Sequence, residues 1–202
     1  MSSAYRPVPA RVAGPADVDA VVETLTAAFF EDPLWGPAFP DRARRAEQAA
    51  AFWRLYAVSA QRYPWTLITG AADAVSLWIP PGGTELTEAE EAGMGDLLTG
   101  VAGEQVSEDI LRICEQLEEV HPTEPHFYLS LLATNPDHRG RGIGMGLVAE
   151  ALSRIDALGA PAYLESSNPA NLHRYERAGF VPRTTVTTAG GQVVTTMWRP
   201  GR

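Results

Sequence analysis

The chain has 202 residues, of which 45% are hydrophobic and 20% are charged, a composition typical of one globular domain. Its formal net charge of −9 argues against a nucleic-acid partner, which would require a basic surface, and favours the approach of cationic small molecules. The N-terminus lacks the apolar segment of a signal peptide, and no run of apolar residues is long enough to predict a membrane span. We therefore expect a cytoplasmic protein with no membrane partner.

The first sixty residues are predicted to form one strand and two helices. Residues 7–13 indicate the strand, and Gly14-Pro15 then opens a helix whose apolar face repeats from Val18 to Phe29. This helix should end before Pro33, because proline disfavours the helical conformation in the residue that precedes it. A long second helix is expected over residues 42–62, with Trp53 and Tyr56 on its apolar, core-facing side.

The segment between these helices, residues 29–35, combines large aromatic side chains with two adjacent carboxylates. Such a set suits a pocket for an amine attached to an apolar body. The alternative is a surface loop whose aromatic residues only anchor it to the core. The candidate substrate-binding residues are Phe29, Glu31, Asp32 and Trp35.

The middle of the chain predicts a hairpin followed by an acidic helical segment. Residues 65–69 and 74–79 form the hairpin, with turn residues between them. Residues 85–120 have a helical pattern that glycines at 93, 95, 100 and 103 divide into two helices, and we interpret them as an insertion that could close over an acceptor pocket. Cys114 lies on the apolar face of the second helix and is expected to be buried rather than reactive, while residues 115–119 indicate a solvated face.

A glycine-rich loop then separates a strand at residues 126–134 from a helix that begins near residue 147. Glycines alternate at positions 140, 142, 144 and 146, where the absence of Cβ atoms lets a ligand approach the backbone and permits positive φ. The unpaired N–H groups and the dipole at the start of a helix favour a bound anion. The loop is therefore predicted to be a phosphate cradle, to which Arg139 and Arg141 add positive charge; the alternative is an ordinary turn with two surface arginines.

Two other phosphate-binding motifs do not fit this loop. A P-loop requires Gly-Lys followed by Ser or Thr, and the loop contains no lysine. A dinucleotide fingerprint, Gly-x-Gly-x-x-Gly, would need its third glycine at Met145 or Leu147.

The last forty residues complete the predicted sheet. Residues 162–166 should form a strand parallel to residues 126–134, with the intervening helix as a right-handed crossover. A short helix over 169–178 and a hairpin of strands 180–187 and 193–199 follow. The expected architecture is one α/β domain spanning residues 1–202.

Two blocks carry a family resemblance. Arg139-x-x-Gly142-x-Gly144 matches the Arg/Gln-x-x-Gly-x-Gly/Ala signature of the GNAT superfamily of acyl-CoA-dependent N-acetyltransferases. The next block of that family, an Asn before a helix that carries a Tyr and ends in Gly-Phe, matches Asn168, Tyr175 and Gly179-Phe180. Within the superfamily, the segments PDHRGRGIG, PAYLESS, NLHRYERAGF and MWRP most resemble the antibiotic-resistance branch typified by puromycin N-acetyltransferase.

The resemblance implies a GNAT fold, with a mixed sheet of about six or seven strands, one splayed parallel pair and flanking helices. It also implies acetyl-CoA as co-substrate and direct transfer of the acetyl group to a primary amine of a small molecule. The residues that would bind CoA are Leu132, Ala133, Thr134, Arg139, Gly140, Arg141, Gly142, Ile143, Gly144, Asn168 and Asn171.

The same resemblance provides two candidate catalytic residues. Tyr175 would act as general acid toward the CoA thiolate, because a phenol stays protonated at neutral pH; the alternative is a core tyrosine packed beside Phe180. Glu165, at the end of its strand, would be the general base, with Glu31, Asp32, a water chain or a purely structural acid as alternatives.

Other functions remain open at this stage. A protein or peptide N-acetyltransferase and a non-catalytic acyl-CoA sensor both share the cradle, although a sensor would be free to lose Tyr175. No metal site is expected, because the four histidines and the cysteine lack a recognised ligand spacing. Both a monomer and a homodimer are compatible with the sequence.

Overall fold

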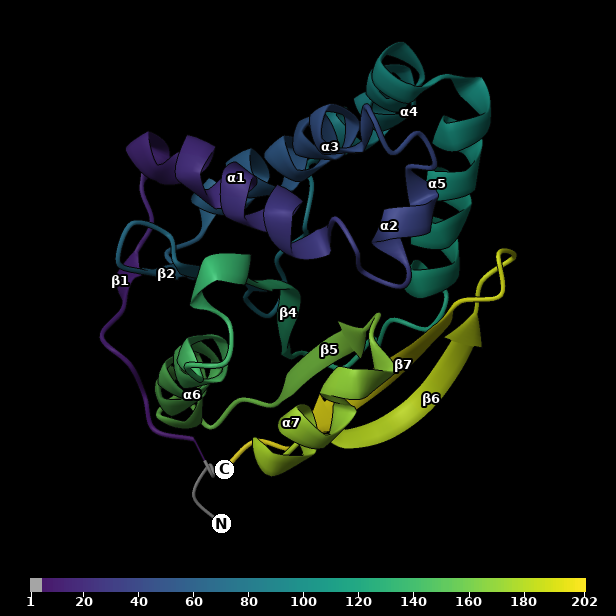
Figure 1. Ribbon diagram of the computed structural model, residues 1–202. Coiled ribbons are helices and arrows are strands. Elements are labelled where there is room, and N and C mark those ends of the chain that lie inside the picture. The colour runs from purple at the N-terminus through teal and green to yellow at the C-terminus, as the bar shows by residue number, and fades with distance from the viewer. Residues whose placement is uncertain (1–4) are drawn as a thin grey trace.

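A seven-stranded mixed sheet forms the centre of the molecule in a computed structural model that describes residues 5–202 (Figure 1). The strand order is β1-β2-β3-β4-β5-β7-β6, and neighbouring strands are antiparallel except for the parallel pair β4–β5. The predicted α/β mixed sheet is therefore confirmed. The strands are β1 (Arg11–Val12), β2 (Thr66–Thr69), β3 (Ala74–Ile79), β4 (Phe127–Thr134), β5 (Ala162–Ser166), β6 (Val181–Thr187) and β7 (Val193–Arg199).

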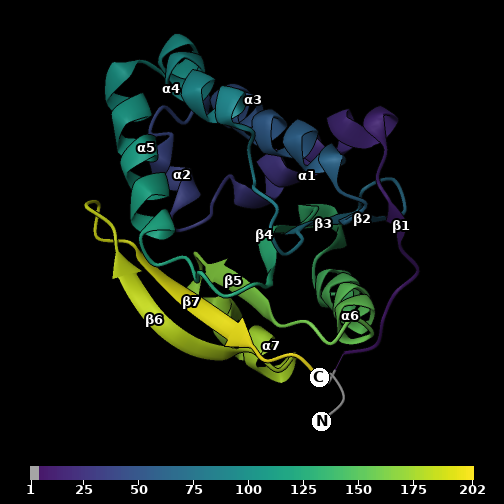
Figure 2. The ribbon, with the colours of Figure 1, turned by 180° about the vertical axis from the view of Figure 1, so that it is seen from behind.

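Helices cover both faces of the sheet, as Figures 1 and 2 show from opposite sides. One face carries α1 (Val18–Phe29) and α3 (Arg45–Ser59), with α4 (Glu88–Ala102) and α5 (Glu104–Glu118) beyond them, and the other carries α6 (Ile143–Asp156). The short helix α7 (Leu172–Arg177) follows β5. The apolar face of α1 and α3 packs on Leu77 and Leu131, whereas α6 packs on Leu129 and Leu164. The sheet thus separates two hydrophobic cores.

The N-terminal strand is much shorter than predicted. Residues 7–13 were expected to be extended and paired, but only Arg11 and Val12 pair with β2. Pro7 and Pro9 have no N–H group and so cannot donate to a ladder, which limits the strand to the residues after them.

The segment after α1 contains a short helix that the sequence did not predict, α2 (Trp35–Ala38). An Asp32 carboxylate oxygen accepts hydrogen bonds from the backbone N–H groups of Leu34 (3.0 Å) and Trp35 (3.2 Å). This side-chain bond starts the turn that α2 continues. A similar turn at Asp41, which accepts from the N–H of Ala43, delays the start of α3 to Arg45.

The acidic segment forms two helices, as predicted, but only one of its glycines divides them. Gly103, with φ of 93°, ends α4 and precedes α5. Gly95 stays helical and allows close packing, because its carbonyl accepts a hydrogen bond from Ser107 Oγ of α5 at 3.0 Å. The prediction that Gly93, Gly95 and Gly100 interrupt the helix was wrong, since glycine is only mildly unfavourable inside a helix.

A buried ion pair joins three elements at one end of the sheet. Arg199 ends β7, is 1% exposed, and donates to both carboxylate oxygens of Asp156 at the end of α6, at 2.6 and 2.8 Å. Its Nε also donates to the carbonyl of Ala178, directly after α7. Bidentate pairs of this kind are among the stronger polar contacts in proteins.

We predict that Arg199→Ala lowers the free energy of unfolding by about 2–3 kcal/mol, since it leaves Asp156 without its cation. The Arg199 guanidinium lowers the pKa of Asp156 below its usual value. This contribution is therefore present above about pH 4 and is lost as the pH falls through the pKa of the folded state. Urea unfolding of the wild type and of Arg199→Ala should be measured from pH 7 to pH 3. The difference between their free energies of unfolding should become smaller toward acid pH.

The matched control is Arg112→Ala, because Arg112 pairs with Asp109 on the surface, where both side chains are about half exposed. That substitution should change the free energy of unfolding by less than about 1 kcal/mol. Equal losses for the two variants would contradict the role assigned to Arg199.

Candidate active site

The parallel strands β4 and β5 pair for only part of their length. Three pairs connect them, Phe127–Ala162, Tyr128–Tyr163 and Leu129–Leu164. Beyond these pairs β4 continues to Thr134 alongside β3, and β5 continues to Ser166 alongside β7. The backbone of residues 130–134 therefore has no strand partner on the β5 side. The predicted splay is confirmed.

A β-bulge lies where the two strands separate. Leu77 of β3 faces Leu131 and Trp78 faces Leu129, so Ser130 is an extra residue in β4. The bulge changes the alternation of side chains, because Leu129 packs toward α6 while Leu131 and Ala133 pack toward α1 and α3. Ser130 lines a cavity at this point, where its hydroxyl lies close enough to Glu85 to oppose the rise in that carboxyl's pKa.

The loop between β4 and α6 has the geometry expected of an anion cradle. Gly140 and Gly142 have φ values of 78° and 74°, in the left-handed region that favours glycine, and open space surrounds both positions. Gly142 is the N-cap of α6, and no side chain among the described residues caps this helix. The N–H groups of the first turn, from Ile143 onward, thus remain available to an anion.

The other two glycines, expected in the loop, lie in the first turn of α6 and have a different role from the one expected. A Cβ atom at Gly144 would collide with Thr134 Oγ1, and one at Gly146 would lie 2.5 Å from Val8 Cγ1. Neither residue has positive φ. These glycines let α6 pack tightly against β4 and the N-terminal segment, so they position the cradle and do not clear space for a ligand.

The two arginines of the loop differ in their surroundings. Arg139 donates from Nη2 to the carbonyl of Ala28 at 2.9 Å, which fixes the loop against the end of α1. Arg141 is exposed in the turn that precedes α6. Arg141 therefore lies directly before the uncapped N-terminus of α6.

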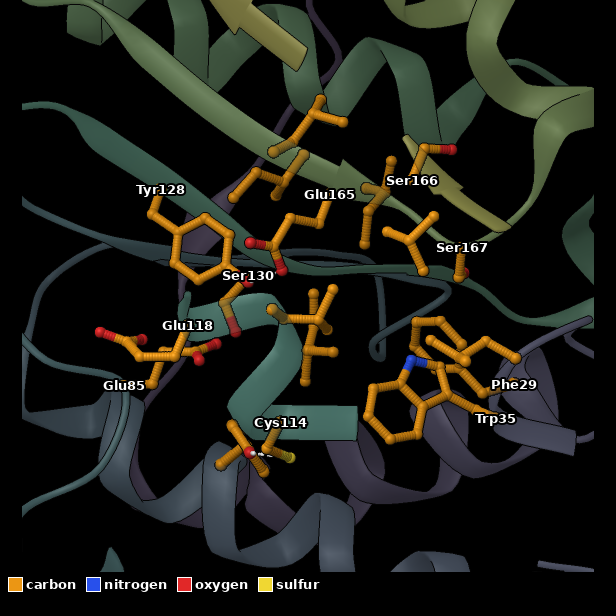
Figure 3. A pocket seen from close by; sticks show the side chains of 18 of the residues that line it. Phe29, Trp35, Glu85, Cys114, Glu118, Tyr128, Ser130, Glu165, Ser166 and Ser167 are labelled. Carbon is orange, nitrogen blue, oxygen red and sulfur yellow. Dashed lines mark hydrogen bonds between the residues drawn. The ribbon is translucent and has the colours of Figure 1, made fainter. Parts of the chain in front are cut away.

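A cavity of about 620 Å³ lies on the α1–α3 side of the splayed strands (Figure 3). Glu165, Tyr128 and Ser130 gather on one side of it, and Phe29 and Trp35 lie on another. Its aromatic wall is a packed cluster, with Trp35 and Trp53 ring centroids 5.3 Å apart. Trp53 and Tyr56, assigned to the core from sequence, line this wall as well.

The helical insertion contributes to the wall of the cavity. Residues from Glu85 to Met94 and the last turns of α5 contribute to its lining. Every charged residue in the described lining is acidic, including those of the segment interpreted as a solvated face. The acidic lining residues are Asp32, Glu85, Glu91, Glu115, Glu118, Glu119 and Glu165.

Asp32 and Glu31 point to different parts of the protein. Asp32 lines the cavity, where its second carboxylate oxygen accepts from Ser167 Oγ at 2.9 Å and so joins the α1–α2 loop to the end of β5. Glu31 does not line it; the side chain is 63% exposed, pairs with Arg42, and faces a separate groove beside α1 and α3. The prediction that both carboxylates face one amine was therefore wrong, because consecutive residues in this turn diverge.

Glu165 is a buried carboxylate of the cavity, with 6% of its side chain exposed. It accepts hydrogen bonds from the phenols of Tyr128 (3.0 Å) and Tyr163 (2.9 Å). His121 approaches the same carboxylate, with 3.8 Å between its Nδ1 and Oε1 of Glu165. No pattern in the sequence predicts these partners, since they come from the turn after α5 and from β4 and β5.

Tyr175 of α7 lines the cavity and also packs edge-on against Phe180, with ring centroids 6.2 Å apart. Burial, together with the negative charge of Asp32, raises the pKa of Tyr175 to about 12. The phenol therefore stays protonated at neutral pH. Asn171 also lines the cavity, whereas the Asn168 side chain accepts from the N–H of Ala170 and caps the turn before α7.

Cys114 and Glu85 are cavity residues with strongly perturbed acidity. Burial raises the pKa of the Cys114 thiol to about 12, so it is a thiol and not a nucleophilic thiolate at neutral pH. Burial also raises the pKa of Glu85 to about 7, with a further increase from the negative charge of Glu165. Glu85 was not identified from the sequence, where it is one of many acids in the insertion.

Within residues 5–202, no cluster of three or more His, Cys, Asp or Glu side chains could hold a metal ion. None of the helices in this range has the length and apolar character needed to cross a bilayer.

The profile of the acetyltransferase (GNAT) family matches residues 77–180, which contain the splayed strand β4, the cradle and Tyr175. The chain belongs to this family. GNAT enzymes use acetyl-CoA as co-substrate and act on amine acceptors, so the protein is an acetyl-CoA-dependent N-acetyltransferase.

Solved structures share this fold over nearly the whole chain. A Corynebacterium glutamicum structure described as histone acetyltransferase HPA2 and related acetyltransferase is 24% identical, with a TM-score of 0.70 over 100% of this chain and 98% of its own. Arylalkylamine N-acetyltransferase 2 from Aedes aegypti is 13% identical, with a TM-score of 0.64 over 95% and 98%. The Drosophila melanogaster polyamine N-acetyltransferase is 16% identical, with a TM-score of 0.59 over 95% and 99%.

We predict that Gly144→Ala weakens CoA binding at least about tenfold and destabilises the fold by about 1–3 kcal/mol, since the new methyl group forces α6 away from Thr134. Adding Thr134→Ala to this variant removes the hydroxyl with which the new methyl group collides. The double variant should regain most of the lost CoA affinity and most of the lost free energy of unfolding. Calorimetric titration with CoA and urea unfolding measure the two effects.

The control for this pair is Gly93→Ala in α4, where nothing lies within 4 Å of the new Cβ atom. It should leave CoA affinity unchanged and stabilise the protein slightly, by up to about 1 kcal/mol. If Gly144→Ala bound CoA as tightly as the wild type, the packing role of Gly144 would be refuted.

Proposed function

We propose that the protein transfers the acetyl group of acetyl-CoA directly to the primary amine of a small cationic molecule with an apolar body. The observation that carries this proposal is the cavity itself, which adjoins the splayed strands, is acidic throughout its charged lining, and has an aromatic wall. Acidic side chains attract an ammonium group, and aromatic faces bind both apolar groups and cations.

The cradle and the splayed strands fit the two parts of CoA. The unpaired N–H groups at the start of α6 suit its pyrophosphate, and the unpaired backbone of residues 130–134 suits the amide groups of its pantetheine arm. This arrangement would bring the thioester to the cavity beside Tyr175 and Glu165.

The proposed roles of these two side chains follow from their surroundings. Glu165 would accept the proton of the substrate ammonium, after which the free amine attacks the thioester carbonyl. Tyr175 would donate its proton to the departing CoA thiolate and recover one from the nitrogen of the new amide. Its raised pKa keeps the phenol protonated at neutral pH. Asp32 would hold the α1–α2 loop and Phe29 and Trp35 would contact the acceptor's apolar body.

Two observations narrow the acceptor. Neighbouring structures are described as acetyltransferases of agmatine, arylalkylamines and polyamines, which are compact amines. Residues of α5, in the helical insertion, form one wall of the cavity. A cavity enclosed in this way suits a compact molecule better than a lysine of a protein chain. The motif resemblance to the puromycin N-acetyltransferase branch makes an aminonucleoside antibiotic such as puromycin the first candidate.

A thiol-release assay with acetyl-CoA tests the proposal. The panel should include puromycin, agmatine, spermidine, an arylalkylamine and a peptide with a free lysine. We expect turnover with at least one small amine and little with the peptide. Turnover of the peptide alone would contradict the assignment, as would the absence of turnover with every small amine.

We predict that Tyr175→Phe lowers kcat by about 10²–10⁴-fold, because it deletes the proton of the general acid and keeps the aromatic ring. CoA affinity, measured by calorimetry, should barely change. Phe180→Leu serves as the control for the ring contact, because it alters the packing of Tyr175 without removing the phenol. A Tyr175→Phe enzyme with wild-type kcat would show that another group protonates the thiolate.

A further inference from the structure

Glu165 lies between the cavity and a histidine that the cavity does not reach. The carboxylate lines the cavity and is 6% exposed, whereas His121 is absent from the lining and has 24% of its side chain exposed. The Nδ1 atom of His121 is 3.8 Å from Oε1 of Glu165. The carboxylate therefore has one side toward the substrates and another toward a partly exposed imidazole.

Three rings and one helix end fix the position of His121. Its ring centroid lies 4.8 Å from that of Tyr128, 5.0 Å from that of Tyr163 and 5.0 Å from that of His126. Its backbone N–H donates to the carbonyl of Glu118 at 3.1 Å, in the turn that follows α5. Pro122 comes next and prevents the helix from continuing, so His121 is held where the chain leaves α5.

Acidic groups outweigh the effect of burial on this imidazole. Burial of the ring lowers the pKa of His121, but the carboxylates of Glu165, Glu118 and Glu85 raise it, and the net change is a rise. The carbonyl end of α5 acts in the same direction. Imidazole is the side chain best suited to receive and release protons.

The other groups packed around His121 are less suited to carrying a proton. Burial lowers the pKa of His126, and its Nδ1 lies 2.6 Å from the carbonyl oxygen of Glu124 and not near Glu165. Burial, together with the charge of Glu165, raises the pKa of the Tyr128 and Tyr163 phenols well above their ordinary range. Of these groups, His121 alone combines contact with Glu165 and access to solvent.

Direct transfer creates a need for such a path. The acceptor enters as an ammonium ion, and its nitrogen loses two protons in each turnover. Under the proposed mechanism one of them replaces the proton that Tyr175 gives to CoA, and the other goes to Glu165. While substrates or products fill the cavity side of Glu165, a path on its other side lets the carboxyl group lose this proton before the next ammonium arrives.

We propose that His121 relays this proton from Glu165 to solvent, on the side of the carboxylate that the substrates leave free. The step rests on the proposed function. Oε1 of the protonated Glu165 gives its proton to the lone pair of Nδ1, and the imidazolium so formed releases the Nε2 proton to water, so the proton that Glu165 took from the ammonium reaches solvent. Exchange of the remaining ring proton from Nδ1 to Nε2 through water restores the starting tautomer. Since 3.8 Å exceeds hydrogen-bond distance, the transfer uses a rotation of the ring or one bridging water molecule.

The experiment compares the first turnover with later turnovers in His121→Phe, which keeps an aromatic ring among its neighbours but cannot relay a proton. With the best acceptor of the thiol-release panel, rapid-quench kinetics should show one CoA released per site at the wild-type rate, because Glu165 begins as a carboxylate. Later turnovers should be slower by at least about tenfold, since Glu165 then discharges slowly. In His121→Ala, added imidazole should restore the later turnovers.

Two controls separate a relay from a structural role. His126→Phe alters a ring that packs against His121 and should leave both phases at the wild-type rate. Glu165→Gln should slow the first turnover as well, because it removes the acceptor of the proton. Thermal unfolding establishes that each variant is folded. The imidazole rescue is measured with His121→Ala alone, so it does not depend on the folding of His121→Phe.

The relay would be overturned if His121→Phe kept the wild-type steady-state rate, or if its first and later turnovers slowed together without rescue of His121→Ala by imidazole. A wild-type protein that acetylated none of the panel amines would instead overturn the proposed function.

Discussion

The early end of the β4–β5 ladder is the constraint on which the rest of the structure depends. Strands that paired along their full length would leave no unpaired backbone for a co-substrate and no opening between the cradle and the cavity. The bulge at Ser130 and the separation after Leu129 and Leu164 create that opening. Each strand keeps its other neighbour, β3 for β4 and β7 for β5, so the opening forms without loss of the sheet. Unpaired backbone groups in a folded protein require partners, and a ligand can supply them.

Charge and burial then distinguish the parts of the site. The exposed acids of α5 lie around the cavity, where they can draw a cation inward, while Glu165 is buried and held by two phenols. Asp32 has a further role, because its hydrogen bonds to Leu34, Trp35 and Ser167 fix the aromatic loop against the end of β5. Under the proposed mechanism, the carboxylates would serve cation attraction, proton transfer and loop geometry, according to where each one lies.

Local patterns in the sequence were sufficient for most of the fold. The strands Ala74–Ile79, Ala162–Ser166 and Val193–Arg199 have the predicted bounds, because alternating apolar residues and flanking glycines and prolines define them locally. The splay came from the family resemblance carried by Arg139, Gly142, Gly144 and Tyr175. The helix at Trp35–Ala38 was missed because one side-chain hydrogen bond starts it.

The candidate site was less accessible to sequence reasoning. Glu31 and Asp32 are adjacent in the chain, but the turn directs them to different surfaces. His121, Tyr128 and Tyr163 meet at Glu165 only through the packing of α5 against the sheet, so no spacing along the chain predicts them together. Gly144 was expected in the loop but lies in the first turn of α6, and its closest neighbour is Thr134 of β4, a contact that only the folded chain reveals.

The crystal structure of the complex with acetyl-CoA would test the central claim most directly. We expect the pyrophosphate oxygens within about 3.2 Å of backbone N–H groups of residues 140–145. The pantetheine arm should lie between β4 and β5, and its thioester should open into the cavity beside Tyr175. A complex in which CoA occupies the groove beside α1 and α3, with water filling the gap between β4 and β5, would contradict the account.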